Sequence, residues 1–153
     1  LMPMHAGFKV KIADEKGWLP EFAFLGGMIL PFTADKAFKP EYSGGNMRLA
    51  FSHILSDRFS LGYNLGAEWN GVTVFPDYFY SLALGIGVSD AFGVFLESYC
   101  TIPDKGVDAH LLDAGFTYLL LPNFQLDISG GIGLNDAAPE NYISFGLTYR
   151  ILE

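Results

Sequence analysis

Bulky apolar residues alternate with small or polar residues in segment after segment of this chain. In 59–69 the odd positions are Phe, Leu, Tyr, Leu, Ala and Trp, whereas the even positions are Ser, Gly, Asn, Gly and Glu. A period of two is the signature of a β-strand, and no stretch shows a helical period. The pattern predicts an all-β, antiparallel chain of about nine strands, at 7–13, 22–30, 46–54, 59–69, 78–88, 93–101, 112–120, 124–134 and 143–151.

The face opposite the bulky residues separates a membrane barrel from a soluble one. That face is small and polar, and only 17% of the chain is charged while 50% is hydrophobic and 16% aromatic. A soluble β-fold buries its bulky face and carries many charges outside. We therefore predict a transmembrane β-barrel with a lipid-facing exterior and a polar interior. A soluble barrel that binds an apolar ligand inside remains an alternative.

The connections between the predicted strands alternate in length. Short links are expected at 55–58, 89–91 and 121–123, and longer ones at 33–45, 70–77, 102–110 and 135–141. Up-and-down outer-membrane barrels have tight periplasmic turns, longer outer loops and an even strand number. Nine strands is odd, the first would begin outside, and no signal peptide opens the chain. We therefore expect 1–153 to be one barrel domain, the C-terminal part of a larger barrel, without its N-terminal strands and signal peptide.

Composition and spacing argue against several other classes. The net charge is −8 with no basic cluster, so no nucleic-acid partner is expected. No apolar run is long enough for a membrane-spanning helix. Cys100 is the single cysteine, and His5, His53 and His110 lie in separate segments without metal-ligand spacing. We predict no metal, no cofactor and, since no catalytic triad is visible, no enzymatic activity.

Several short stretches are similar to one known family. They read DAGFTY at 113–118, PNFQLD at 122–127, GIGLND at 131–136 and GLTYR at 146–150. In these the chain resembles the outer-membrane transporters associated with the meta pathway of phenol degradation. The resemblance implies a barrel in the bacterial outer membrane and passive passage of small, hydrophobic or aromatic molecules. It supplies no catalytic residue.

The polar positions that alternate with bulky residues are the candidate binding residues of a lumen. They are Lys9, Lys11, Glu21, Arg48, Asn64, Glu68, Glu97, Asp113, Gln125, Asp127 and Arg150. Acting together they would select what passes, whereas pairing among them, as between Asp127 and Arg150, would only stiffen the wall. Phe79, Phe95 and Tyr99 are also candidates for the interior.

The leading hypothesis is thus a channel whose partners are outer-membrane lipid and a small-molecule solute. The alternative within the same fold is a non-conducting structural or adhesion barrel, closed by pairs of opposite charges. The sequence predicts neither the substrate nor the oligomeric state.

Overall fold

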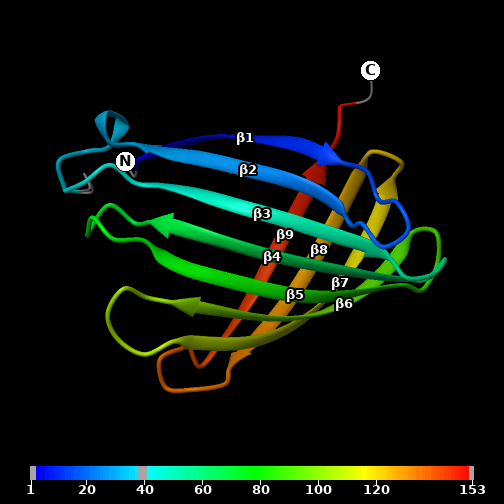
Figure 1. The fold of residues 1–153 in the computed structure, drawn as a ribbon. Helices are drawn as coiled ribbons and strands as arrows, with labels where there is room; N and C mark the ends of the chain where they lie inside the picture. The colour runs from blue at the N-terminus through cyan, green and yellow to red at the C-terminus, as the bar shows by residue number, and fades with distance from the viewer. Residues whose placement is uncertain (1–2, 38–40, 152–153) are drawn as a thin grey trace. The chain divides into compact units, whose positions relative to one another are not determined.

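The computed structural model describes residues 3–37 and 41–151, which form nine β-strands and one short 3-10 turn (Figure 1). The elements are β1 (Met4–Ala13), β2 (Glu21–Leu30), η1 (Pro31–Thr33), β3 (Gly45–Ile54), β4 (Phe59–Trp69), β5 (Asp77–Gly87), β6 (Phe92–Ile102), β7 (Ala109–Leu121), β8 (Phe124–Gly133) and β9 (Asn141–Tyr149). Among the described residues, no helix has the length and apolarity needed to cross a membrane.

The strands form one sheet in which every strand pairs with its sequence neighbours (Figure 1). The order runs from β1 to β9 without a crossover, and the pairs β1–β2, β2–β3, β7–β8 and β8–β9 are antiparallel. β1 and β9 are the two ends of this order, so the sheet is not closed by the strands described. The predicted all-β, antiparallel, up-and-down fold is confirmed, and the open sheet is consistent with a piece of a barrel.

The strands begin and end close to where alternation predicts. β4 coincides with the predicted 59–69, whereas β1 and β7 each begin three residues earlier and β9 ends two residues earlier than expected. The strands contain between 9 residues, in β9, and 13, in β7. A tilted strand needs about 9 to 11 residues to cross a bilayer, so every strand is long enough.

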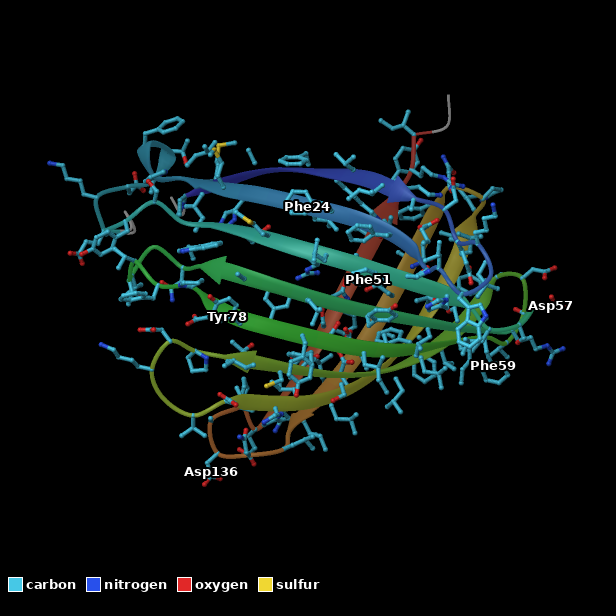
Figure 2. The ribbon with its side chains drawn as sticks, viewed as in Figure 1. Phe24, Phe51, Asp57, Phe59, Tyr78 and Asp136 are labelled. Atoms are coloured by element: carbon cyan, nitrogen blue, oxygen red, sulfur yellow. The ribbon has the colours of Figure 1, made fainter. Side chains whose placement is uncertain are left out.

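Two of the predicted short turns share one local structure. In the turn before β4, the Ser56 hydroxyl accepts a hydrogen bond from Phe59 N, and Leu55 N donates to Phe59 O. Ser89 and Phe92 repeat this pattern in the turn before β6. Figure 2 shows Asp57 within the first of these turns and Phe59 at the start of β4. In each turn a serine hydroxyl thus accepts the hydrogen bond of the backbone N–H that begins the next strand.

The chain divides into two compact units, which we describe separately. Unit 1 comprises Leu1–Ser52, Tyr63–Tyr80 and Thr101–Val107. Unit 2 comprises His53–Gly62, Ser81–Cys100 and Asp108–Glu153. Strands β3, β4, β5 and β6 each contribute residues to both units.

The bulky residues occupy the exposed face of each unit. We call this face the bulky face and its opposite, with the small and polar residues, the polar face; successive residues of a strand alternate between the two. In unit 2 Phe145 is 77% exposed on the bulky face, whereas Asp113 on the polar face is 7% exposed. In unit 1 Phe8 is exposed and Ala23 is buried. In β7 and β8 the bulky positions are the more exposed ones, which is the reverse of a soluble β-sandwich, whereas β1 is exposed on both faces.

Aromatic side chains stack along the bulky face. In unit 1 the Phe51 ring lies between those of Phe22 and Tyr63, at centroid distances of 4.8 and 4.9 Å. Register places Phe24 on this same face of β2, and Figure 2 labels it with Phe51. In unit 2 the rings of Phe92 and Phe116 are 5.8 Å apart. Each pair joins neighbouring strands through contact between their side chains.

Candidate functional site: the polar face

In unit 1 the polar face collects basic residues from β1 and β3. Lys9 lies opposite Leu25, which in turn lies opposite Arg48, so all three side chains project on one face. Lys11 Nζ is 2.8 Å from a carboxylate oxygen of Glu21 and also pairs with Asp14 beyond the end of β1. Lys11 and Glu21 therefore pair with each other. This is the wall-stiffening role that was predicted from the sequence as the alternative to selecting a solute.

Arg48 contacts an aromatic ring two strands away. Its guanidinium carbon lies 4.8 Å from the centroid of the Phe79 ring, a cation–π contact. The strand between them, β4, carries Gly66 at this position, and a Cβ there would lie 2.2 Å from the tip of the Phe79 ring. The ring can cross β4 because Gly66 has no side chain. Phe79 is thus confirmed on the polar face.

In unit 2 a tyrosine crosses a glycine in the same way. Asp113 in β7, Gly131 in β8 and Tyr142 in β9 lie in one register row. The Tyr142 hydroxyl donates a hydrogen bond of 2.6 Å to Asp113 Oδ2. A Cβ on Gly131 would lie 2.3 Å from the Tyr142 ring, so the glycine provides the space in which the ring lies.

The Asp113 carboxylate is buried and only half satisfied. Among the described residues its Oδ1 atom has no hydrogen-bond partner, although Oδ2 accepts from Tyr142. Tyr99 is hydrogen-bonded to Tyr142, so the two phenols and the carboxylate form one polar cluster. A buried acceptor without a donor is costly. Asp113 Oδ1 is therefore a buried acceptor whose desolvation no hydrogen bond among the described residues offsets.

Small residues leave room beside this cluster. A Cβ on Gly115 would lie 2.6 Å from the Phe95 ring, and one on Gly146 would lie within contact of the Asp127 carboxylate. Phe95 and Asp127 therefore lie across glycines of the adjacent strands on the polar face. Because the glycines have no side chain, large side chains lie flat along the sheet and do not project far into the volume above the polar face.

The predicted pair between Asp127 and Arg150 is wrong. Asp127 lies opposite Gly146, and Arg150 follows the end of β9, where its backbone N–H bonds to Asn123 O. Four residue positions along a strand amount to about 13 Å, too far for an ion pair. The Arg150 side chain instead approaches Pro122 O at 3.5 Å. Arg150 therefore belongs to the short-turn end of the strands and not to a lumen lining.

The remaining candidates lie on the polar face without forming one constellation. Gln125 pairs with Thr148, Glu97 and Asn64 are half-buried, and Glu68 is exposed near the end of β4. The structure thus brings together Lys11 with Glu21 but leaves the other predicted residues distributed along the sheet. Sequence reasoning missed Tyr142, whose signal is an aromatic residue out of phase with the bulky positions of β9.

The longer loops of unit 1 enclose a pocket of about 510 Å³, which we call the loop pocket. Tyr42 N donates to Gly71 O at 2.9 Å, which joins the loop before β3 to the loop after β4; residues 38–40 of the former lie outside the described residues. Three carboxylates line the pocket with apolar and aromatic side chains. The lining includes Glu41, Tyr42, Val74, Phe75, Asp77 and Asp104.

A third grouping joins residues that the sequence keeps apart. Cys100 Sγ in β6 lies 3.9 Å from His110 Nε2 in β7, with Asp108 beside them. The ten-residue separation carries no recognisable ligand motif, because the contact depends on the pairing of two strands across a loop. The absence of metal-ligand spacing in the sequence therefore did not reveal that possible ligand atoms of Cys100, Asp108 and His110 lie close together.

Comparison with known proteins gives one result that covers nearly the whole chain. No curated protein matches it. The model of the family described as "Putative MetA-pathway of phenol degradation" matches residues 3–151, which include all nine strands. This chain therefore belongs to that family.

Proposed function

We propose that this chain forms the wall of a bacterial outer-membrane channel for passive passage of small hydrophobic or aromatic molecules. In this account the bulky face contacts lipid and the polar face lines the path of the solute. The protein is a transporter and not an enzyme.

The observation that carries the proposal is the exposure of bulky apolar side chains along one face of the strands. Ile143, Phe145 and Leu147 follow one another on the bulky face of β9, and each is at least 70% exposed. The polar face opposite them contains Ser144 and Gly146. Lipid accommodates such an apolar surface, whereas water penalises it by about 25 cal/mol per Å².

The polar face supports passage of a solute because it is polar without being crowded. Gly115, Gly131 and Gly146 carry no side chain, and the buried Asp113 carboxylate accepts a hydrogen bond from a phenol, that of Tyr142. The phenolic hydroxyl of a solute would donate in the same way to an accessible carboxylate of this face, such as the half-buried Asp127. The loop pocket adds aromatic walls and three carboxylates at the long-loop end, where a solute would first bind. The family description, which names phenol degradation, supports the same substrate class.

The experiment compares two adjacent residues of β8 whose side chains lie on opposite faces of the sheet, in the protein as its host expresses it. Ile128→Arg puts a charge on the bulky face, and Ser129→Arg puts one on the polar face. A lipid-facing arginine near the bilayer midplane costs about 2–4 kcal/mol, whereas a lumen-facing one tunes selectivity. We expect Ile128→Arg to reduce the folded, heat-modifiable fraction in outer membranes. Ser129→Arg should fold and shift the current in planar bilayers toward anions.

Three outcomes would contradict parts of this proposal. Recovery of the unmutated protein in the soluble fraction would exclude the lipid-facing assignment. Normal membrane folding of Ile128→Arg would do the same for the bulky face. A folded barrel without conductance, or one whose current phenol does not reduce, would leave the fold in place but reject the channel for aromatic solutes.

A further inference from the structure

Three side chains with different metal-binding atoms meet where β6 and β7 flank their connecting loop. Cys100 Sγ and His110 Nε2 are 3.9 Å apart, and these atoms and a carboxylate oxygen of Asp108 all lie within 4.8 Å of one another. Cys100 is only 1% exposed, while Asp108 and His110 are half-buried. All three residues belong to unit 2.

The loop between β8 and β9 fixes the backbone that carries two of these groups. The Asn135 side chain donates to Asp108 O at 2.6 Å and accepts from His110 N at 3.2 Å. Leu134 N donates to His110 O at 2.8 Å. The positions of Asp108 and His110 are therefore set by hydrogen bonds that leave the carboxylate and imidazole unused. These bonds fix the backbone positions from which the two side chains extend.

We propose that Cys100, Asp108 and His110 bind a zinc ion. Zinc bonds are about 2.3 Å to sulfur and about 2.0 Å to nitrogen and oxygen, with tetrahedral angles. A tetrahedral ion would thus hold sulfur and nitrogen about 3.6 Å apart, so Cys100 and His110 need to approach by only a few tenths of an ångström. The Asp108 oxygen, within 4.8 Å of both atoms, closes the site by a side-chain movement of up to about 1.5 Å. Three protein ligands leave the fourth position for water, on the half-buried side formed by Asp108 and His110.

The ligand set distinguishes zinc from the hard cations. Calcium and magnesium take oxygen ligands and would gain nothing from a thiolate or an imidazole. A thiolate, an imidazole and a carboxylate together suit zinc and the other borderline or soft divalent ions. The assignment depends on this local geometry alone, so it holds whether or not the barrel conducts.

Binding would join the two ends of the β6–β7 loop. Cys100 lies in β6 before the loop, Asp108 is the last residue of the loop, His110 lies in β7, and the exposed Lys105 is between Cys100 and Asp108 in the chain. A metal that holds both ends restricts local opening of the segment, which trypsin needs in order to cleave after Lys105. Lys36, exposed in a different loop, provides an internal control for cleavage.

The test uses the whole protein, folded in detergent and freed of metal, with cobalt(II) and zinc(II) as the probes. We expect one equivalent of cobalt to bind with a thiolate-to-cobalt charge-transfer absorption, and zinc to displace it. Cys100→Ser should abolish that absorption. His110→Gln should weaken binding at least about tenfold. His5→Gln, outside the group, should bind cobalt as the unmutated protein does. Zinc should slow cleavage after Lys105 and leave cleavage after Lys36 unchanged.

Two results would overturn the zinc assignment. One is the absence of stoichiometric uptake with a thiolate absorption in the correctly folded protein, which would reduce the Cys100–His110 contact to a weak hydrogen bond. The other is equal affinity in the unmutated protein and in His110→Gln. Should Cys100→Ser fail to give a heat-modifiable band, His110→Gln decides the question, because its Gln retains a polar side chain at a half-buried position.

Discussion

Phe79 in unit 1 and Tyr142 in unit 2 each cross a glycine on the polar face, and they reach different partners. In unit 1 the Phe79 ring crosses Gly66 to contact Arg48, which is exposed. In unit 2 the Tyr142 ring crosses Gly131 and donates a hydrogen bond to the buried Asp113. In both units a glycine makes room for the ring, but the charged partner differs. Arg48 is exposed to solvent, whereas Asp113 is buried.

The difference indicates which polar residues the fold depends on. An exposed cation over a ring contributes about 0.5–1 kcal/mol and can be lost cheaply. A buried carboxylate that loses its donor retains its full desolvation cost. We therefore expect the Asp113–Tyr142 contact to matter for stability and the Arg48–Phe79 contact to be adjustable.

The largest expected effect comes from Gly131→Ala. Its Cβ would occupy the space of the Tyr142 ring and separate the phenol from Asp113, at a cost of about 3 kcal/mol. Gly130→Ala is the matched control, because the atom nearest to its Cβ would be Tyr142 O at an ordinary 3.5 Å. Urea titration of folding into lipid vesicles measures both changes. Equal losses for the two variants would show that the ring position does not matter.

A smaller loss is expected for Tyr142→Phe, which keeps the ring but removes the donor to Asp113. Loss of a hydrogen bond to a charged group costs about 2 kcal/mol. Tyr149→Phe, in the same strand but exposed on the bulky face, should change the free energy of folding by less than about 0.5 kcal/mol. The same titration compares the two. A loss in Tyr149→Phe as large as in Tyr142→Phe would remove the special role of the buried cluster.

The smallest effect is expected in unit 1. Arg48→Gln removes the cation above the Phe79 ring and should cost about 0.5–1 kcal/mol. Phe79→Leu removes the ring, and in a double-mutant cycle the coupling between the two changes should not exceed that value. A coupling energy above that of Tyr142 with Asp113, measured in the same way, would reverse the order of the two units.

The strands could be predicted from sequence because their evidence is local. Alternation in 59–69 depends only on adjacent residues, and β4 has those limits. The face of the sheet on which each side chain lies could also be predicted, because it follows from alternation. Phe79 and Phe95 lie on the polar face as expected.

Register was the information that the sequence did not supply. The side chains of Asp127 and Arg150 were predicted on adjacent strands, but pairing needs residues directly opposite, and the register separates them. For the same reason the Asp113–Tyr142 contact, which spans an intervening strand, could not be predicted. The meeting of Cys100 with His110 likewise depends on how two strands pair across a loop.

The most direct test of the account asks which face of the sheet contacts lipid. In a background of Trp18→Phe and Trp69→Phe, a single tryptophan is placed by Phe116→Trp on the bulky face or by Phe95→Trp on the polar face. In vesicles of lipids with brominated acyl chains, we predict strong quenching of the tryptophan at 116. The tryptophan at 95 should instead be quenched by aqueous iodide. Quenching by bromine at 95 and not at 116, or at neither position, would contradict the assignment of the bulky face to lipid.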